Sequence, residues 1–344
     1  MNDDINELLL ICRELGDRAD LFQGGGGNIS LKLDTRIMAI KASGLRIAEL
    51  TADRGLVKVD FSMLQNFYQQ ADRAQSIRLD RESGRVVEKA TIADGTNHCR
   101  PSIETGFHAL LGKYVLHSHS VYANLITCAE NGKKMVEELF PNDEALFVPF
   151  APPGFYLTLE VKETIERTQK EPRVLFLKNH GLIVVGCTAA QALDKHKEVD
   201  QRIKNKFSLN DPYPEIRIET LKENKFRSQS PFLKKFIREN QEYFTRLPNH
   251  ILFPDQTVFC AMAKLAGTPG SADSKICVNL EDNSLIYNAS AAEAQTIEEI
   301  LVAWSFILTE IKRAHLQAEF ISGKHSVFIG NMESEKYRKD LLKK

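Results

Sequence analysis

The stretch VLHSHS at residues 115–120 places His117 and His119 one residue apart within an apolar run. On a β-strand, side chains at positions i and i+2 point to the same face of the sheet, so both imidazoles would face one side. Two imidazoles whose backbones lie roughly 6–7 Å apart can bind a single metal ion. An HxH pair also arises by chance in a chain with nine histidines, so a metal site needs support from other residues.

A third imidazole comes from KNHGLIV at residues 178–184, where His180 ends a predicted strand directly before Gly181. A lone histidine at a strand end is more often structural than a ligand. Together with His117 and His119, however, it gives three imidazoles at or beside strand ends in a sheet-rich region. Three imidazoles plus an open position is the composition of a catalytic zinc site.

A carboxylate candidate lies in RPSIETGFHALL at residues 100–111, where a helix is predicted over 102–111. Glu104 and His108 are four residues apart and would share one face of this helix. Ser102 would sit at the helix start, where free N–H groups and the helix dipole favour an anion. The simpler interpretation is an exposed Glu–His pair on a surface helix. Alternatively, Glu104 could complete the metal coordination or act as an acid/base next to the metal.

The glycine run GGGGNIS at residues 24–30 has two interpretations. It does not match a Walker motif, because no Gly-Lys-Ser/Thr follows, and it does not match a Rossmann fingerprint, because a strand follows it instead of a helix. As a linker, four glycines would be unremarkable. Their backbone N–H groups could also form an anion-binding nest, to which Asn28 would add a side-chain amide.

Composition limits the classes of partner. Of the 344 residues, 43% are hydrophobic and 26% are charged, which is typical of a soluble globular protein. Lys and Arg number 45 against 46 Asp and Glu, so no basic excess indicates binding to nucleic acid or to a membrane surface. The acidic start MNDDINELLLICREL lacks the features of a signal peptide, and no apolar run reaches the roughly 20 residues of a membrane helix. Six scattered cysteines without a CxxC pair fit reduced thiols, so we expect a cytoplasmic protein.

Periodicity predicts the elements that would position these side chains. Strands are expected near residues 29–33, 36–44, 55–61, 115–120 and on both sides of 179–181, and helices near 4–16, 102–111, 121–138, 158–169 and from 189, after an N-cap at Thr188. Residues 83–95 resemble a hairpin, and the polar, proline-containing residues 207–235 resemble a linker. Beyond them, DQTVFCAMA (255–263) and SKICVNLEDNSLIYNA (274–289) are predicted as strands, and 291–318 as one long helix.

Five motifs occur in one order within residues 5–207: the glycine-rich loop with GNIS, KASG, PSIE, HSH and NHGLIVVG. In this order they closely resemble the class II aldolase/adducin family, which includes fuculose-1-phosphate and rhamnulose-1-phosphate aldolases. The resemblance implies an α/β fold of three αβα layers, with a central, largely antiparallel sheet flanked by helices. It implies a catalytic domain over 1–207, which we expect to be followed by a linker or helical connection at 208–245 and a smaller accessory α+β module at 246–344.

The resemblance also implies roles for the candidate residues. His117, His119 and His180 would bind zinc, and Glu104 would be the catalytic acid/base that also reaches the metal when substrate is absent. The positions that match the family's substrate-phosphate site are Gly27, Asn28, Ser43, Gly44 and Ser102. A site of three histidines also accepts Mn²⁺, Co²⁺ or Fe²⁺. One departure is Ile103, which stands where sugar-phosphate aldolases carry the second serine of Pro-Ser-Ser-Glu and removes a hydroxyl donor to the anion.

These roles predict a zinc-dependent lyase that cleaves a small sugar or sugar phosphate by retro-aldol chemistry through a metal-stabilised enediolate. Epimerases, dehydratases and decarboxylases of the same family use related chemistry and stay open as alternatives. A non-catalytic, adducin-like scaffold is disfavoured, because all three histidines and Glu104 are present. The family's habit of forming tetramers implies a homo-oligomer, whose other partner would be the small-molecule substrate.

Overall fold

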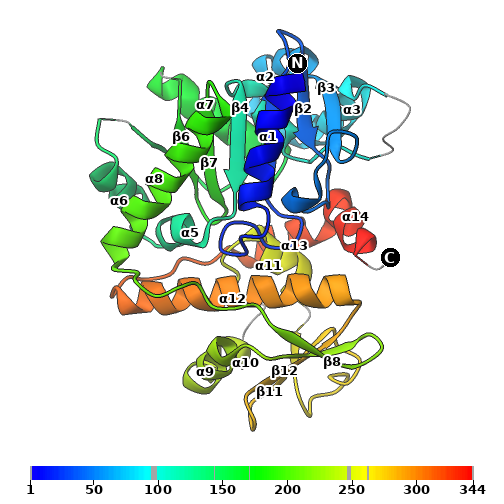
Figure 1. Cartoon of the computed structure of the whole chain (residues 1–344), viewed down its shortest axis with the longest axis vertical. Coiled ribbons are helices and arrows are strands. Elements are labelled where there is room, and N and C mark those ends of the chain that lie inside the picture. The colour runs from blue at the N-terminus through cyan, green and yellow to red at the C-terminus, as the bar shows by residue number, and fades with distance from the viewer. Residues whose placement is uncertain are drawn as a thin grey trace. The chain divides into compact units, whose positions relative to one another are not determined.

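The computed structural model describes residues 2–93, 99–142, 144–169, 171–245, 249–261 and 263–342. The chain divides into two compact units, each with its own β-sheet (Figure 1). The first unit holds residues 1–127 and 131–206, and the second holds residues 128–130 and 207–344.

Strands and helices alternate along the first unit. Its elements are α1 (Asn2–Leu15), β1 (Asn28–Lys32), β2 (Ile37–Lys41), η1 (Ile47–Glu49), β3 (Leu56–Asp60), α2 (Phe61–Gln69), η2 (Arg73–Gln75), α3 (Ser76–Ala90), α4 (Thr105–Leu110), β4 (Tyr114–Ser118), α5 (Val121–Thr127), α6 (Gly132–Leu139), β5 (Leu146–Val148), α7 (Phe155–Thr168), β6 (Val174–Leu177), β7 (Gly181–Gly186) and α8 (Ala189–Phe207). As expected, Thr188 caps α8, because its hydroxyl accepts a hydrogen bond from the backbone N–H of Gln191 at 3.2 Å.

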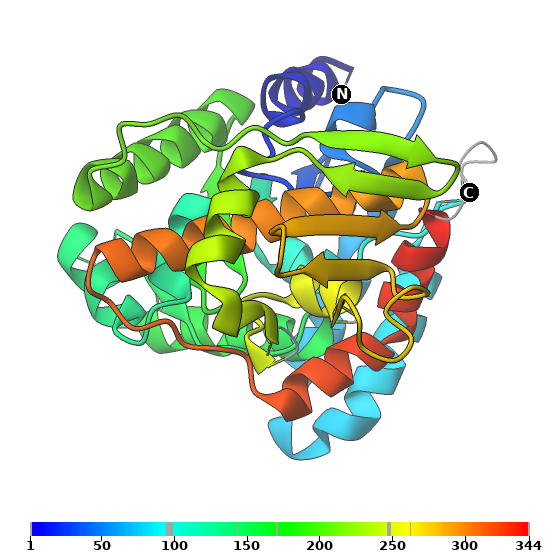
Figure 2. The same ribbon diagram turned by 90° about the horizontal axis from the view of Figure 1, so that it is seen from below.

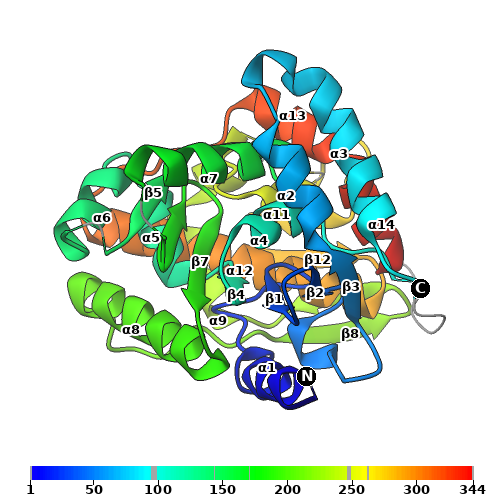
Figure 3. The ribbon, with the colours of Figure 1, turned by 90° about the horizontal axis from the view of Figure 1, so that it is seen from above.

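The sheet of the first unit has the strand order β3-β2-β1-β4-β7-β6-β5. All neighbouring strands are antiparallel except β5 and β6, which are parallel. Helices α1 and α8 lie on one side of this sheet, and α2, α4 and α7 lie on the other (Figure 3). The three-layer fold with a largely antiparallel sheet is therefore confirmed.

The central strand β4 carries the HxH pair. It pairs with β1 on one side and β7 on the other, and all five of its residues are buried. Val115 points to the face on which Phe107 of α4 and Leu157 of α7 form an apolar core. Because side chains alternate along a strand, His117 shares this face and Ser118 points to the opposite one. Polar side chains buried in such a strand need hydrogen-bonding or charged partners, so the residues around His117 and Ser118 should be polar as well.

Two expectations for the first unit were wrong. The predicted hairpin at 83–95 instead contributes residues 83–90 to α3, while residues 94 and 95 lie outside the described part of the chain. Val86 and Val87 pack against the core together with Ala90, which follows them by four and three residues, and the hairpin interpretation missed this helical spacing. The single helix predicted at 121–138 is two helices, α5 and α6. Residues 128–130 separate the two helices and belong to the second unit. There the Glu130 N–H donates to the carbonyl of Gln317, and the Glu319 N–H donates to the carbonyl of Cys128.

The second unit is an α+β module. Its elements are β8 (Ile218–Lys222), β9 (Lys225–Ser228), α9 (Pro231–Glu239), α10 (Gln241–Thr245), α11 (Pro254–Cys260), β10 (Ala263–Leu265), β11 (Ile276–Asn279), β12 (Ser284–Asn288), α12 (Ala291–Arg313), α13 (Gly323–Asn331) and α14 (Glu333–Leu341). The sheet has the order β10-β11-β12-β9-β8, and α12 packs against β8 and β9 (Figure 2).

The linker expected at 208–245 differs from the structure. This segment contains helices α9 and α10, but it also supplies β8 and β9, and β9 pairs with β12 inside the second sheet. The sequence suggested a linker because β8 is an edge strand with four exposed residues out of five. A mostly exposed edge strand has the polar composition of a loop.

Two further predictions for the second unit need correction. Of residues 255–263, which were predicted as a strand, 255–260 lie in helix α11, whose seven residues are all buried, and Ala263 begins strand β10. A short apolar run does not distinguish a buried helix from a buried strand, and Pro254 at the first helical turn was the missed signal. The long helix α12 ends at Arg313, five residues before the predicted end, and His315 has a left-handed φ of 55°. Across the described residues, no helix combines the length and apolar character that crossing a membrane requires.

A buried carboxyl group lies under the sheet of the second unit. Glu298 of α12 accepts hydrogen bonds from the Ser228 hydroxyl at 2.8 Å and from the Tyr287 hydroxyl. Burial raises the pKa of Glu298 from its usual value of 4.5 to about 7, although both hydrogen bonds act to lower it. The folded chain therefore holds a proton on Glu298 at pH values where the unfolded chain has released it.

This proton makes stability depend on pH. The stabilisation from protonated Glu298 is fully present below about pH 4.5 and is lost as the pH rises to about 7. Over that range, the free energy of unfolding of the wild type should fall by about 3 kcal/mol relative to that of Glu298→Gln. Urea unfolding followed at several pH values measures this difference, and parallel pH profiles for the two proteins would contradict it.

Candidate metal centre

Three imidazoles converge beside the centre of the first sheet. His117 lies on β4, His119 directly follows β4, and His180 occupies the turn between β6 and β7. Their ring centroids form a nearly equilateral triangle with sides of 5.1, 5.0 and 5.0 Å. One nitrogen from each ring lies within 4.8 Å of the others, and all three residues are buried. This spacing allows one ion to contact all three rings.

Strand pairing orients His117. Its Nδ1 is 3.0 Å from the backbone carbonyl of Leu182 on β7, so Nδ1 carries the proton and donates it. Nε2 then keeps its lone pair, and it has no hydrogen-bond partner among the described residues. Burial lowers the pKa of His117 well below its usual range, although the nearby Glu104 carboxylate acts to raise it. A neutral imidazole with one nitrogen fixed by a carbonyl and the other available is the metal-binding form of histidine.

Glu104 lies against the histidine triangle. It occupies the N-cap position of α4, with Oε1 3.2 Å from His180 Nε2 and Oε2 3.5 Å from His117 Nε2. Burial acts to raise the pKa of Glu104, but His117 and His180 together hold it well below its usual range. The carboxylate is therefore charged while it is almost completely excluded from water, at 5% exposure. The donor set of three imidazoles and one carboxylate fits a divalent transition metal.

Two of the residues expected to bind phosphate contact Glu104 in this structure. Asn28 on β1 donates from Nδ2 to Glu104 Oε2 at 2.6 Å and to the Ser102 hydroxyl oxygen at 3.0 Å. Ser102 Oγ also accepts from the backbone N–H of Glu104 at 3.2 Å. Asn28 reaches this position because it pairs with His117 across β1 and β4. Both side chains therefore position the carboxylate.

The other expected phosphate residues lie on two adjoining loops. Gly27 and Gly44 both have positive φ, of 69° and 80°, which favours glycine at each position. A Cβ atom on Gly25 would lie 2.8 Å from the carbonyl oxygen of Gly44, so the glycine run and the KASG turn pack backbone against backbone. Ser43 belongs to the same turn, and its N–H donates to the carbonyl of Arg100 at 2.9 Å.

A buried lysine ties these two loops together. Lys41, at the end of β2, is 1% exposed, and its Nζ donates to the carbonyl of Gly25 at 3.1 Å and to that of Leu45 at 2.7 Å. Sequence reasoning did not place Lys41 among the site residues. The signal was its place in KASG, directly before the turn, but neither spacing nor composition shows that its ammonium group reaches the glycine run.

A second group of side chains holds β4 from the opposite face. The Ser118 hydroxyl lies 2.7 Å from His196 Nε2, His196 Nδ1 lies 3.2 Å from Asp200 Oδ2, and the Ser120 hydroxyl donates to Asp200 Oδ1 at 2.7 Å. All four residues are buried. Sequence reasoning missed His196 and Asp200, whose four-residue spacing on α8 was the available signal. They fix the strand on which the HxH pair lies.

Gly27 offers a test of how tightly this strand is packed. A Cβ atom there would lie 2.8 Å from the carbonyl oxygen of His117 and 2.7 Å from the Phe22 ring, at a φ of 69°. We expect Gly27→Ala to lower the free energy of unfolding by about 1–3 kcal/mol through backbone strain and crowding. Urea denaturation measures this change.

Gly84→Ala is the matched control, because Gly84 lies within helix α3 and a Cβ atom added there would have no other atom within 4 Å. It should raise the free energy of unfolding by about 0.5–1 kcal/mol, the helix preference of alanine over glycine. Equal effects of the two replacements would show that the contact between Gly27 and His117 is loose.

This fold and geometry define an α/β protein with a candidate metal centre. The chain belongs to the class II aldolase/adducin family, because the family model described as "Class II Aldolase and Adducin N-terminal domain" matches residues 6–206. This match confirms the family that the five motifs indicated.

Several curated proteins are similar to this chain. "Uncharacterized oxidoreductase YuxG" from Bacillus subtilis (strain 168) is 28% identical over 266 residues, which cover 72% of this chain and 37% of that protein. The chain thus spans well under half the length of this relative. A 3-oxo-tetronate 4-phosphate decarboxylase from Haemophilus influenzae is 23% identical, covering 54% of this chain and 79% of the relative. An L-fuculose phosphate aldolase from Methanococcus vannielii is 24% identical, covering 58% and 92%.

One solved structure supports the fold of the first unit. The N-terminal class II aldolase domain of a conserved protein from Thermoplasma acidophilum aligns with a TM-score of 0.50 at 26% sequence identity. The alignment covers 59% of this chain and 92% of that one.

Proposed function

We propose that this chain is a divalent-metal-dependent lyase, with zinc as the first candidate ion, that cleaves a small sugar or sugar phosphate by retro-aldol chemistry. The observation that carries the proposal is the triangle of His117, His119 and His180 with the Glu104 carboxylate against it. A scaffold without catalytic function would have no physical reason to bury three imidazoles and a charged carboxylate together.

The three imidazoles would hold the ion. When bound, a divalent cation would act as a Lewis acid toward the oxygens of the substrate and stabilise the negative charge that carbon–carbon cleavage leaves on them. The hydrogen bond from His117 Nδ1 to Leu182 keeps this ring in the required tautomer and orientation.

Glu104 would transfer the proton. The Glu104 carboxylate lies against the histidine triangle, where it could accept the hydroxyl proton released on cleavage, and the resulting acid could return that proton to the carbon that has lost its bond. Asn28 and Ser102 would keep the carboxylate aimed during both steps, because they contact Oε2 and the Glu104 backbone N–H. During turnover the three histidines would hold the metal and Glu104 would transfer the proton, whereas without substrate Glu104 would also reach the metal.

The two glycine loops favour an anionic substrate. Gly27 and Asn28 come from the glycine run, and Ser43 and Gly44 come from the KASG turn that packs against it. Backbone N–H groups in such loops can bind a phosphate, and the buried Lys41 ammonium places a positive charge behind both loops. Ser102 is committed to Asn28 and Glu104 here, so we assign it to positioning the carboxylate rather than to phosphate binding.

Decarboxylation is the second candidate reaction, favoured by the similarity to a 3-oxo-tetronate 4-phosphate decarboxylase. Cleavage of a carbon–carbon bond is common to both reactions, and Glu104, after taking up a proton from water, could deliver that proton to the carbon that loses CO₂. A homo-oligomer, with the tetramer as the form expected from the family, is part of the proposal, and light scattering of the purified chain tests it.

One screen separates these possibilities. The full chain, loaded separately with Zn²⁺, Mn²⁺ and Co²⁺, is incubated with ketose 1-phosphates, their unphosphorylated sugars and 3-oxo acid phosphates. Release of an aldehyde supports the aldolase, and release of CO₂ supports the decarboxylase. The absence of both products with every metal, in protein shown to contain metal, would overturn the lyase proposal.

A further inference from the structure

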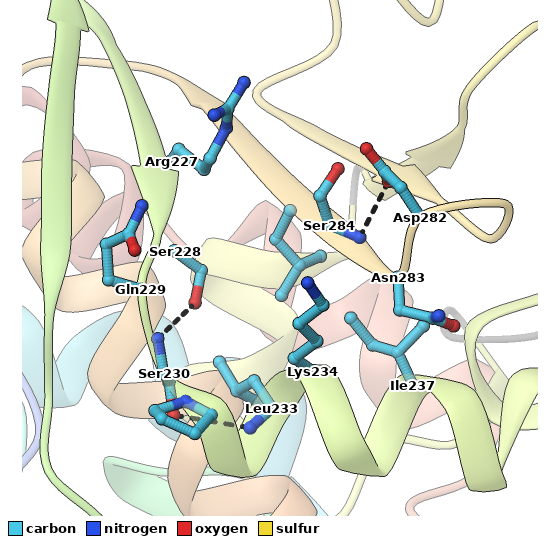
Figure 4. A pocket seen from close by; sticks show the side chains of 12 residues that line it. Arg227, Ser228, Gln229, Ser230, Leu233, Lys234, Ile237, Asp282, Asn283 and Ser284 are labelled. Carbon is cyan, nitrogen blue, oxygen red and sulfur yellow. Dashed lines mark hydrogen bonds between the residues drawn. The ribbon is translucent and has the colours of Figure 1, made fainter.

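The second unit contains a cavity unrelated to the histidine triangle. It has a volume of about 460 Å³ and lies between helix α9, the end of β9 and the turn that leads into β12 (Figure 4). Leu233, Ile237 and Leu285, which are almost fully buried, supply apolar lining. The volume falls within the range of pockets that bind small molecules.

Two cations line this cavity. Arg227 comes from β9 and Lys234 from α9, so their charges approach from two different elements. Within the described part of the chain, neither side chain forms an ion pair with a carboxylate. Both side chains are exposed and have no carboxylate partner among the described residues, so both are available to an anionic group in the cavity. A phosphate monoester, with a charge of about −1.5 to −2 at pH 7, matches two cations better than a carboxylate with a single charge does.

The opposite side of the cavity carries acceptors. Asp282 and Asn283 lie on the β11–β12 turn, across the cavity from Arg227 (Figure 4). Asp282 Oδ1 accepts from the backbone N–H of Ser284 at 3.1 Å. Asn283 Oδ1 is buried and accepts no hydrogen bond from the described residues. A buried acceptor in this position would be satisfied by a hydroxyl donor on a ligand. Asp282 would repel a phosphate, so the two sides of the cavity suit different parts of one molecule.

We propose that this cavity binds a compact phosphate monoester with free hydroxyl groups, its phosphate between Arg227 and Lys234 and its hydroxyls toward Asp282 and Asn283. The apolar lining would contact the carbon skeleton. This would be a second small-molecule site, separate from the proposed catalytic centre.

Trp304 provides a local signal for the test. It is the only tryptophan of the chain, it is buried in α12, and its ring lies 5.5 Å from the ring of Phe236 on α9, the helix that lines the cavity. Titration of the full chain with glycerol 3-phosphate should produce a saturable change in tryptophan fluorescence. Glycerol tests the need for an anion, and glycerate tests whether a carboxylate can replace the phosphate. We expect no saturable response to glycerol and a weaker one to glycerate.

Charge replacements assign the signal to the cavity. Lys234→Gln and Arg227→Gln should each weaken glycerol 3-phosphate binding by about tenfold, the effect of losing a charge-assisted hydrogen bond. Lys235→Gln is the matched control, because Lys235 is the next residue of α9, is exposed and does not line the cavity. It should leave the affinity unchanged.

Equilibrium dialysis with labelled glycerol 3-phosphate provides a second measurement that does not depend on Trp304. Binding that is unchanged in both Lys234→Gln and Arg227→Gln would overturn the proposal, as would equal losses in Lys234→Gln and Lys235→Gln. A response to glycerol as strong as that to glycerol 3-phosphate would also overturn it, because the cations would then have no role.

Discussion

His119→Ala should release the bound metal and lower lyase activity about a thousandfold, because Lewis-acid stabilisation contributes several kcal/mol and each 1.36 kcal/mol is a factor of ten in rate. His119 supplies one of the three imidazoles whose centroids lie 5.0–5.1 Å apart, and two imidazoles alone hold a divalent ion weakly. Mass spectrometry of the metal content per chain checks the first effect, and the product assay checks the second. We expect about one ion per wild-type chain.

His325→Gln is the control for nonspecific binding, because His325 is exposed and lies on α13 of the second unit. It should retain the metal and the activity. Circular dichroism establishes that His119→Ala is folded, and chelation of the wild type provides a test without any replacement. Activity that survives chelation, or metal that stays bound in folded His119→Ala, would contradict the assigned centre.

Glu104→Gln should keep the metal but lower activity by a factor of about 10²–10⁴, the usual contribution of a positioned general acid or base. Glutamine has the shape of glutamate and can still accept the hydrogen bond from Asn28, but it cannot accept a proton from the substrate. Metal content and turnover are measured on the same preparation, so that the two roles are separated.

The outcome distinguishes two functions of this carboxylate. Loss of both metal and activity would make Glu104 chiefly a ligand, and full activity would exclude it from proton transfer. Glu163→Gln is the control, because Glu163 is a carboxylate of the same unit that pairs with Arg73 on the surface. It should change neither quantity.

The three histidines proposed as metal ligands could be found from the sequence because their positions follow from local rules. Alternation along β4 places His117 and His119 on one face, and the NHG turn places His180 beside the start of β7. The partners of these residues were less accessible. Nothing in the spacing shows that Asn28 and Ser102 hold Glu104, because that arrangement depends on the pairing of β1 with β4.

The incorrect element predictions share a physical cause. Residues 254–260 mix polar and apolar side chains that are all buried, so they show neither a strand alternation nor a helical period, and the β-propensity of Thr257, Val258 and Phe259 suggested a strand where packing favours a helix. The edge strand β8 exposes most of its side chains, so its sequence carries little of the alternation that identifies a half-buried strand. Tertiary packing determines the secondary structure of both segments, and the local sequence pattern does not show which distant side chains will pack against them.

The pairing of β4 with β7 has a consequence for folding. The hydrogen bond from His117 to Leu182 joins residues 65 positions apart, and the one from Asn28 to Glu104 joins residues 76 positions apart. Contacts of such high contact order carry a large loop-closure entropy, so they form only with the long-range topology of the domain. A nascent chain that ends before β6 would contain His117 and His119 but no complete site. Metal uptake at the proposed site would therefore require the completed native topology, and a refolding assay based on it would follow the closure of the central sheet.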